Sequence, residues 1–267
     1  MKTKKINIIH NNTEKSLNIT SLLKEKLEHQ GFCITDSFSY DAFLNICVGG
    51  DGAFLRAIHN FDFTNIPFIG INTGTLGFFQ EVSPENLDLL IQKIKNQDYK
   101  IEPIFLVEGI ICTRTSCIEL IAINEIVIKG YHSKTIHLNV SIDNNYLEKF
   151  SGDGVIVSTP IGSTAYNFSC GGSLVYPTLD VLQLTPIAPI NSKAYRSLTS
   201  SIIVPNSLLI QIKPEYRDEN SILIVVDGQE HKYENIVEIS FKISSMKANI
   251  LTLGNHSFWT NVKDKFL

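Results

Sequence analysis

The hydrophobic pattern of this 267-residue chain changes at about residue 100, and this change most constrains its fold. Before that point, the apolar runs Lys5–His10, Phe43–Val48 and Ile66–Ile71 are continuous instead of alternating with polar residues. Continuous runs are typical of parallel strands that are covered on both faces. After the first run, apolar residues recur at helical spacing until Gly31, a residue type that favours helix ends. Residues 1–100 therefore predict an open, Rossmann-like α/β domain.

After residue 100, strand-like runs follow one another with turn residues between them and without a helical period. They include Ile104–Thr113, Thr135–Ile142 and several later segments up to about residue 245. Asp143-Asn144-Asn145 predicts a tight hairpin, since Asn tolerates positive φ angles. We expect a β-rich, β-sandwich-like domain over residues 101–244, packed closely against the first domain with a ligand cleft between them.

Two local patterns make more specific predictions. Ser83 as the N-cap and Pro84 in the first turn predict an α-helix that begins at this point.

The run Leu120–Lys129 predicts one strand, although Asn124 and Glu125 are residue types that strands contain rarely. Side chains alternate along a strand, so only one of these two can face a core. Their donors and acceptors would suit an adenine edge or a pair of ribose hydroxyls.

Charge and composition exclude several functional classes. The chain has 23 Lys and Arg against 27 Asp and Glu, a net charge of -4, so no global positive field would attract a nucleic acid. No apolar run approaches the roughly 20 residues of a membrane-spanning helix. Polar residues soon follow the lysines of residues 1–5, which is unlike a signal peptide. We expect a cytoplasmic protein that binds neither nucleic acid nor membranes.

The cysteines and histidines do not have the spacing of a metal site. The cysteines are odd in number, lack CxxC spacing and mostly stand in apolar runs, so we expect buried free thiols instead of disulfides. They are Cys33, Cys47, Cys112, Cys117 and Cys170. The seven histidines are scattered, and no metal-ligating residue is predicted.

A glycine-rich turn, Gly49-Gly50-Asp51-Gly52, follows the second apolar run and precedes a helical pattern. Glycines let the backbone approach a polyphosphate closely, and a helix N-terminus favours an anion. An aspartate inside such a turn is electrostatically unfavourable for phosphate binding alone, which suggests that it accepts a proton or binds a metal ion. The alternative is an Asp-Gly turn that only caps the helix.

A second glycine-rich segment, Gly152–Gly172, contains a short apolar strand and a series of hydroxylated residues. Ser163 or Thr164 is expected to cap a short helix that ends at Gly171. Hydroxyls, amides and a tyrosine ring at a helix start suit the ribose and base of a nucleotide. The alternative is an ordinary serine-rich loop.

These stretches resemble, in the same order and separation, three motifs of the NAD kinase family. The motifs are the GGDG turn, the NE pair Asn124-Glu125, and the long GDG…STPxGSTAYNxSxGG segment. In addition, Gly70–Phe79 is similar to the family's GxNxGxLGF loop. The resemblance spans most of the chain, and the third motif is highly specific. GGDG alone also occurs in diacylglycerol and sphingosine kinases.

The resemblance implies a kinase that transfers the γ-phosphoryl group of ATP to the 2′-hydroxyl of the adenosine ribose of NAD, with a divalent cation such as Mg²⁺. It implies a nucleotide-binding domain over residues 1–100, to which residues 245–267 return, and an NAD-binding domain over residues 101–244. It also implies a homo-oligomer, commonly a tetramer. Asp51 would be the catalytic proton acceptor. The residues implied at the nucleotide sites are Gly52, Arg56, Asn72, Phe78, Asn124, Glu125, Asp153, Thr164, Ala165, Tyr166, Asn167, Ser169 and Ala188.

Three positions depart from the family pattern. Ala53 stands where Thr often follows GGDG, Ser151 where many members have Arg, and Ile161 where Thr or Ser is commoner. Loss of that Arg would weaken phosphate binding by about 1.5–3 kcal/mol through a missing charge-assisted hydrogen bond. Two other functions share parts of the pattern, a lipid kinase and a non-catalytic NADP-binding sensor. The sequence leaves open whether polyphosphate replaces ATP, whether NADH is accepted and whether NADP inhibits.

Overall fold

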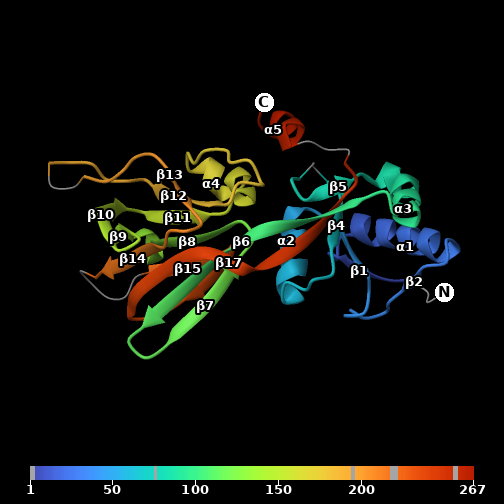
Figure 1. Cartoon of the computed structure of the whole chain (residues 1–267), viewed down its shortest axis with the longest axis horizontal. Helices are drawn as coiled ribbons and strands as arrows, with labels where there is room; N and C mark the ends of the chain where they lie inside the picture. Colours follow the sequence, from blue (N-terminus) through green and yellow to red (C-terminus); the bar gives the residue numbers. More distant parts are fainter. Residues whose placement is uncertain (1–3, 75–76, 194–195, 217–221, 255–257) are drawn as a thin grey trace. The chain divides into compact units, whose positions relative to one another are not determined.

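The chain divides into two units, which we call unit 1 (residues 1–104 and 247–267) and unit 2 (residues 105–246). The structure is a computed structural model that describes residues 4–74, 77–193, 196–216, 222–254 and 258–267. Helices and strands alternate in unit 1, whereas unit 2 consists mostly of strands (Figure 1). Within the described ranges, no helix is both long enough and apolar enough to cross a membrane.

Unit 1 contains a parallel sheet with the strand order β17-β4-β3-β1-β2, and β5 pairs with β4. Its strands are β1 (Lys5–His10), β2 (Cys33–Ile34), β3 (Leu44–Val48), β4 (Phe68–Ile71), β5 (Gln80–Val82) and the end of β17 (Ile236–Thr252). Its helical segments are α1 (Glu14–His29), α2 (Asp51–Asn60), the 3₁₀ turn η1 (Pro84–Asn86), α3 (Leu87–Asn96) and α5 (Phe258–Phe266). The crossovers β1–α1–β2 and β3–α2–β4 run in opposite directions along the sheet, so right-handed connections place α1 and α2 on opposite faces.

Both faces of this sheet are buried, as the continuous apolar runs predict. All five residues of β3 are buried. One face is covered by α1 and α3, which lie side by side (Figure 1) and are joined by the ion pair of Lys26 with Asp88 at 2.6 Å. On the other face, the ring of Phe54 in α2 stacks on that of Phe79 with 5.1 Å between centroids. The predicted N-terminal α/β fold is confirmed.

The ends of the helices follow the predictions in part. Gly31 has a φ of +83° just after α1, which is the conformation that glycine allows at a helix end. The helix predicted from Ser83 begins instead with the 3₁₀ turn η1, and the α-helix starts only at Leu87. The Ser83 hydroxyl makes no capping hydrogen bond, and it accepts one from the side-chain amide of Asn86 at 3.0 Å.

Unit 2 contains two sheets that share one apolar core. The first has the order β10-β9-β14-β17, with β6 beside β17 and β7 beside β6, and the second has the order β13-β12-β11-β8-β15-β16. Its elements are β6 (Lys100–Thr113), β7 (Cys117–Ala122), β8 (Glu125–Gly130), η2 (Tyr131–Ser133), β9 (Ile136–Ile142), β10 (Asn145–Gly152), β11 (Gly154–Ser158), η3 (Ile161–Thr164), α4 (Tyr166–Ser169), β12 (Val181–Ile187), β13 (Ile202–Pro205), β14 (Ile210–Glu215), β15 (Ile222–Val226), β16 (Gln229–Lys232) and the first part of β17. Phe150 and Phe241 of the first sheet and Ile128 of the second are fully buried in this core. The predicted β-sandwich-like fold is confirmed.

Two turns in unit 2 test the sequence predictions directly. Asp143 and Asn144 have φ angles of +48° and +62° between β9 and β10, so the predicted tight hairpin is confirmed. The single strand predicted over Leu120–Lys129 is wrong, because β7 ends at Ala122 and β8 begins at Glu125. The chain breaks there because side chains, described below, bind the backbone between the two strands.

The prediction of free thiols is wrong for one pair of cysteines. Cys112 and Cys117 face each other in the β6–β7 ladder with their Cα atoms 4.0 Å apart, and they form a disulfide. The tight turn between them, in which Thr113 bonds to Ser116, creates this closeness, which cysteine spacing alone does not reveal. Cys47 is a buried free thiol, and burial raises its pKa. Cys33 and Cys170 are also free thiols, but Cys170 is half-buried and Cys33 is exposed, so the predicted burial is wrong for Cys33.

A buried polar pair in unit 1 gives a test of the fold. Asn7 and Asn45 are neighbours on β1 and β3, are at most 1% exposed, and share a hydrogen bond from Asn7 Nδ2 to Asn45 Oδ1 of 2.8 Å. Asn45→Ala leaves the Asn7 donor without this acceptor, so the free energy of unfolding should fall by about 1–3 kcal/mol in urea denaturation. Asn18→Ala, at an exposed position of α1, should change it by less than about 0.5 kcal/mol. Equal effects of the two substitutions would contradict the role of the pair.

Candidate active site

The start of α2 is formed by the glycine turn that follows β3. Gly50 is the N-cap, with a φ of -95° and no side chain to bond the helix amides, and Asp51 is the first helical residue. A Cβ on Gly49 would lie 2.7 Å from that of Ala53, so the turn needs glycine to pass this close to the helix. Asp51 is therefore not the N-cap, and the alternative interpretation, an aspartate that only caps the helix, does not agree with the structure.

The Asp51 carboxylate binds a second loop of unit 1 instead. Its Oδ2 accepts a hydrogen bond from the backbone amide of Phe78 and its Oδ1 from that of Phe79, each at 3.1 Å. The ammonium of Lys265 lies 3.4 Å from Oδ2, and the Asp51 side chain is 29% exposed. The carboxylate is therefore fixed in orientation, while a part of it stays open to solvent.

The loop after β4 is shaped by internal contacts. The Asn72 side chain is 8% exposed, accepts a hydrogen bond from the Gly74 amide at 2.9 Å and donates one to the Gly74 carbonyl at 3.0 Å. Any Cβ on Gly77 would clash with the Asp51 carboxylate and with the Gln80 side chain. Thr75 and Leu76 of the predicted loop motif lie outside the described residues.

Helix α5 contributes a cation and aromatic rings to this region. The Phe78 ring lies 5.7 Å from the ring of Phe266 and 6.5 Å from that of Phe258, measured between centroids. The Lys265 ammonium lies 4.7 Å from the centre of the Phe78 ring, within the range of a cation–π interaction. The end of the chain thus packs against the loop that holds Asp51.

A small hollow lies next to the glycine turn. Its volume is about 290 Å³, and its lining includes His10 and Asn11, which end β1 and follow it, together with Ala53 and Arg56 of α2. Open α/β sheets bind ligands at the carboxyl ends of the strands, where the strand order reverses. In unit 1 that reversal is between β1 and β3, which is where this hollow and Arg56 lie.

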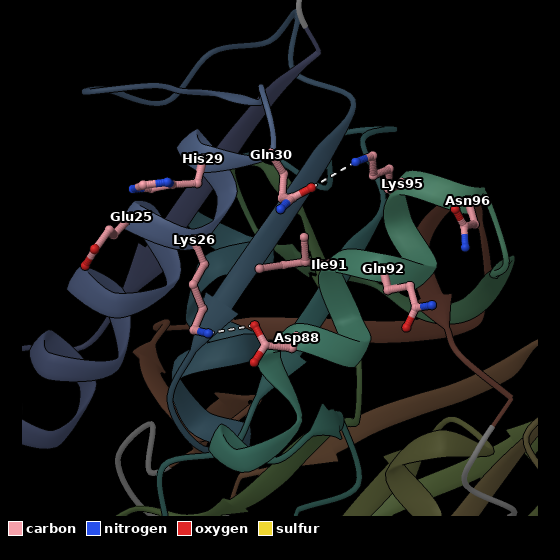
Figure 2. A pocket seen from close by; sticks show the side chains of 9 residues that line it. All are labelled: Glu25, Lys26, His29, Gln30, Asp88, Ile91, Gln92, Lys95 and Asn96. Carbon is pink, nitrogen blue, oxygen red and sulfur yellow. Dashed lines mark hydrogen bonds and ion pairs between the residues drawn. The ribbon is translucent and has the colours of Figure 1, made fainter.

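A larger hollow, of about 580 Å³, lies between α1 and α3 and contains no predicted site residue. Figure 2 shows that several polar groups in its lining already bind one another. Lys26 pairs with Asp88 at 2.6 Å, and Lys95 donates to Gln30 at 2.9 Å. These four side chains of the hollow therefore already have partners.

In unit 2, the turn between β7 and β8 is bound on both sides. Asp227 accepts hydrogen bonds from the backbone amides of Ile123, Asn124 and Glu125 at 2.7, 2.7 and 3.2 Å. On the other side, the Thr159 hydroxyl donates to the Ile123 carbonyl at 2.7 Å, and the Thr159 amide donates to the Asn124 carbonyl at 2.9 Å. The backbone of the Asn124-Glu125 turn is fixed without use of its own side chains.

The hydroxyls of the 158–164 segment mainly hold the protein's own backbone. Ser163 donates to the Val175 carbonyl at 3.2 Å and accepts from its amide at 3.0 Å, while Thr164 donates to the Ile161 carbonyl at 3.1 Å. Neither caps α4, whose N-cap is Ala165, so the predicted capping is wrong. Gly171, with a φ of +83°, follows α4 as predicted.

Three buried polar atoms in unit 2 have no hydrogen-bond partner among the described residues. They are Asn124 Oδ1, Glu125 Oε2 and Asn167 Nδ2, each on a predicted site residue. A buried polar atom without a partner costs about 1–3 kcal/mol, so native proteins keep few of them. A bound ligand that supplies the missing hydrogen bonds would account for all three.

The protonation state of Glu125 differs from that of a solvated carboxyl. Burial, with a smaller effect of the nearby Asp227 charge, raises the pKa of Glu125 from 4.5 to about 8, although a backbone hydrogen bond from Asn167 opposes the shift. At neutral pH Glu125 is therefore protonated and can donate a hydrogen bond.

The other predicted residues of unit 2 are more exposed. Tyr166 is 44% exposed, and its pKa is raised by burial, by Cys170, and by the charges of Glu125 and Asp153. Asp153 and Ala188 are exposed near the end of β11 that is opposite to Glu125. Ala165 is half-buried, and Ser169 is exposed in α4. Among the described residues, no group of three or more His, Cys, Asp or Glu side chains could hold a metal ion.

Sequence reasoning missed two residues that contact predicted site residues, one in each unit. Asp227 is followed by Gly228, a pair that predicts a hairpin turn but does not reveal the contact with a turn about 100 residues earlier. Lys265 stands in a helix near the end of the chain, and nothing in its local sequence indicates a contact with Asp51.

In comparisons with known proteins, both the N-terminal and the C-terminal part of the chain match one family. The family models for the N-terminal and C-terminal domains of ATP-NAD kinases match residues 6–99 and 123–252. A NAD kinase of Finegoldia magna is 46% identical over 269 residues, which cover 99% of this chain and 98% of that protein. A NAD kinase of Streptococcus gordonii is 36% identical over 274 residues, which cover 99% of this chain and 96% of that protein.

Two solved structures share the fold. The first is yeast NADH kinase complexed with NADH, with a TM-score of 0.86 and 21% identity over 98% of this chain and 86% of that chain. The second is a NAD kinase from Archaeoglobus fulgidus in complex with ATP, with a TM-score of 0.78 and 24% identity over 97% of this chain and 99% of that chain.

The contact of Gly77 with Asp51 generates a prediction. Gly77→Ala should displace the Asp51 carboxylate and remove the acceptor of the Phe78 and Phe79 amides, because the added methyl group would occupy its place. Loss of a charged acceptor, about 1.5–3 kcal/mol, should accelerate hydrogen exchange of these two amides roughly 10–100-fold. Gly74→Ala is the matched control, since its Cβ would meet nothing within 4 Å. Unchanged protection in Gly77→Ala would show that the glycine is not needed for this contact.

Proposed function

This chain belongs to the NAD kinase family, and we propose that Asp51 accepts the proton of the NAD 2′-hydroxyl when the γ-phosphoryl group of ATP is transferred to it. One observation carries this role of Asp51. Its carboxylate is held by two backbone amides at the first residue of α2 and is still partly exposed. A general base needs this combination of a fixed direction and access to the substrate.

The transfer changes two bonds to phosphorus and moves one proton. The bond between the 2′-oxygen and the γ-phosphorus forms, while the bond between that phosphorus and its bridging oxygen to the β-phosphate breaks. ADP leaves with the electron pair of the broken bond, and the hydroxyl proton moves to Asp51. Each carboxylate oxygen has two lone pairs, so Asp51 can accept this proton while Phe78 and Phe79 still donate to it. Positioning of the reactants would supply most of the catalysis.

We further propose that unit 2 binds the dinucleotide and unit 1 the phosphoryl donor. The unpartnered atoms of Asn124, Glu125 and Asn167 support this assignment, because ribose and base groups would complete their hydrogen bonds. The exposed ring of Tyr166 would stack on the dinucleotide. The other residues proposed at the nucleotide sites are Gly52, Arg56, Asn72, Phe78, Asp153, Thr164, Ala165, Ser169 and Ala188. Among these, Asn72 would act by shaping its loop, since its side chain already binds Gly74.

ATP is the phosphoryl donor in the reaction of the family, and a divalent cation, Mg²⁺, is part of our proposal. The described side chains do not fit a metal centre built by the protein alone, because they form no cluster of three or more His, Cys, Asp or Glu. We therefore propose that the cation arrives with ATP on its phosphate oxygens, which is how Mg²⁺ commonly enters kinase sites. The cation would offset negative charge on the phosphates.

The lipid-kinase and NADP-sensor alternatives have no observation in their favour. The relatives that match nearly the full length of the chain are named NAD kinase. We also propose a cytoplasmic location.

We propose that the protein is a homo-oligomer, a tetramer, in which a neighbouring subunit completes the site near Asp153. Exposed apolar side chains of unit 2, such as Tyr146, Leu147 and Ile203, support this because a partner would cover them. Specific activity should then fall on dilution to concentrations at which sedimentation analysis detects monomers. A monomer with full activity under assay conditions would contradict the proposal.

The role of Asp51 is tested by Asp51→Asn, which keeps the size of the side chain. The kcat for NAD phosphorylation should fall by about 10²–10⁴-fold, the usual contribution of a general base, while calorimetry should give a similar Kd for NAD. Asp88→Asn is a matched control, because Asp88 also stands in the first turn of a helix but pairs with Lys26 at the surface. Activity of Asp51→Asn within a few-fold of the unmodified protein would remove Asp51 from the chemistry.

A further inference from the structure

Asp227 lies in a two-residue turn between β15 and β16, with φ angles of +45° at Asp227 and +83° at Gly228. This turn directs the Asp227 carboxylate toward the start of β8. Oδ2 accepts from the Ile123 amide, and Oδ1 accepts from the amides of Asn124 and Glu125. In the opposite direction, the Asp227 amide donates to the Glu125 carbonyl at 3.1 Å. Four hydrogen bonds therefore join the two turns.

These bonds replace the ladder hydrogen bonds that are missing where the chain passes from β7 to β8. Ile123, Asn124 and Glu125 are 0, 7 and 6% exposed, so water cannot easily bind their amides. A carboxylate is a strong acceptor for such amides, since hydrogen bonds to a charged group are about twice as strong as neutral ones. One side chain thus determines the path of the backbone that carries Asn124 and Glu125.

The same carboxylate acts on Glu125 through its charge. The charge of Asp227 affects the pKa of Glu125, and the charge of Glu125 affects the pKa values of Tyr166 in α4 and of Cys170. Burial is the main cause that raises the pKa of both Tyr166 and Cys170, so neither is charged at neutral pH. Asp227 is then the negative charge that helps burial to raise the pKa of Glu125 to about 8.

We propose that Asp227 is a positioning residue for the dinucleotide. Asp227 holds Asn124 and Glu125 in the conformation that binds NAD, and it keeps Glu125 a hydrogen-bond donor. This inference rests on the proposed contacts of Asn124 and Glu125 with NAD. Asp227 itself acts through the turn and does not need to touch the substrate.

The test compares Asp227→Asn with Asp143→Asn in the full-length protein. Asn tolerates the positive φ angle at both turns, and Asp143 stands in the analogous turn between β9 and β10. Asp227→Asn should raise the KM for NAD at least about 10-fold with a kcat within about 3-fold, the pattern of lost binding. Hydrogen exchange of the amides of residues 123–125 should accelerate at least about 10-fold. Asp143→Asn should change neither quantity.

A pH series separates positioning from a loss of stability. The affinity for NAD should change with a midpoint near pH 8 in the unmodified protein, because Glu125 titrates there. Removal of the Asp227 charge lowers the pKa of Glu125, so the midpoint should move to lower pH in Asp227→Asn. Glu125→Gln should abolish the transition. A midpoint that does not move in Asp227→Asn would overturn the electrostatic part of the proposal.

Failure of this inference and failure of the proposed function give different results. If Glu125→Ala raises the KM for NAD but Asp227→Asn does not, Asp227 is not a positioning residue. If Glu125→Ala also leaves the KM unchanged, the proposed dinucleotide contacts are wrong. Asp227→Gly, which keeps the turn conformation and removes the carboxylate, replaces the first variant if that one does not fold. Misfolding of both, with Asp143→Asn folded, would mark Asp227 as a folding residue and contradict the proposal.

Discussion

The hydrogen bonds from two consecutive backbone amides to the Asp51 carboxylate fix the geometry on which the proposed role of Asp51 depends. They fix the direction of the carboxylate and also hold the loop after β4. Unit 2 uses the same interaction, since Asp227 accepts from three consecutive amides beside Asn124 and Glu125. In both units a carboxylate holds a turn that secondary structure alone would leave without partners. Strong acceptors suit this role, because buried amides without a partner are costly.

This arrangement divides the polar side chains into two groups with different tasks. Thr159, Ser163 and Asn72 bind the protein's own backbone and have fixed partners. The side-chain atoms Asn124 Oδ1, Glu125 Oε2 and Asn167 Nδ2 are buried and have no partner among the described residues. We therefore propose that a ligand binds the atoms of the second group at little cost in reorganisation.

The sequence predicts much of the fold because local patterns determine it. The continuous run of β3 is fully buried, and Gly31 follows the end of α1, both as expected. Predictions failed where contacts distant in sequence decide the outcome. The strand through Asn124 is broken by Asp227, about 100 residues later, and the disulfide of Cys112 with Cys117 depends on the register of a hairpin. Motifs could indicate candidate site residues, but not which of their atoms are already bonded.

A crystal structure of the protein with NAD bound would test the proposed roles of Asp51, Asn124 and Glu125 together. We expect the 2′-hydroxyl oxygen to lie within about 2.6–3.2 Å of an Asp51 carboxylate oxygen, the reach of a general base. We also expect polar atoms of the same dinucleotide to bind Asn124 Oδ1 and Glu125 Oε2. A 2′-hydroxyl bound away from Asp51, or a dinucleotide that leaves both of these atoms without a partner, would show that the proposed roles are wrong.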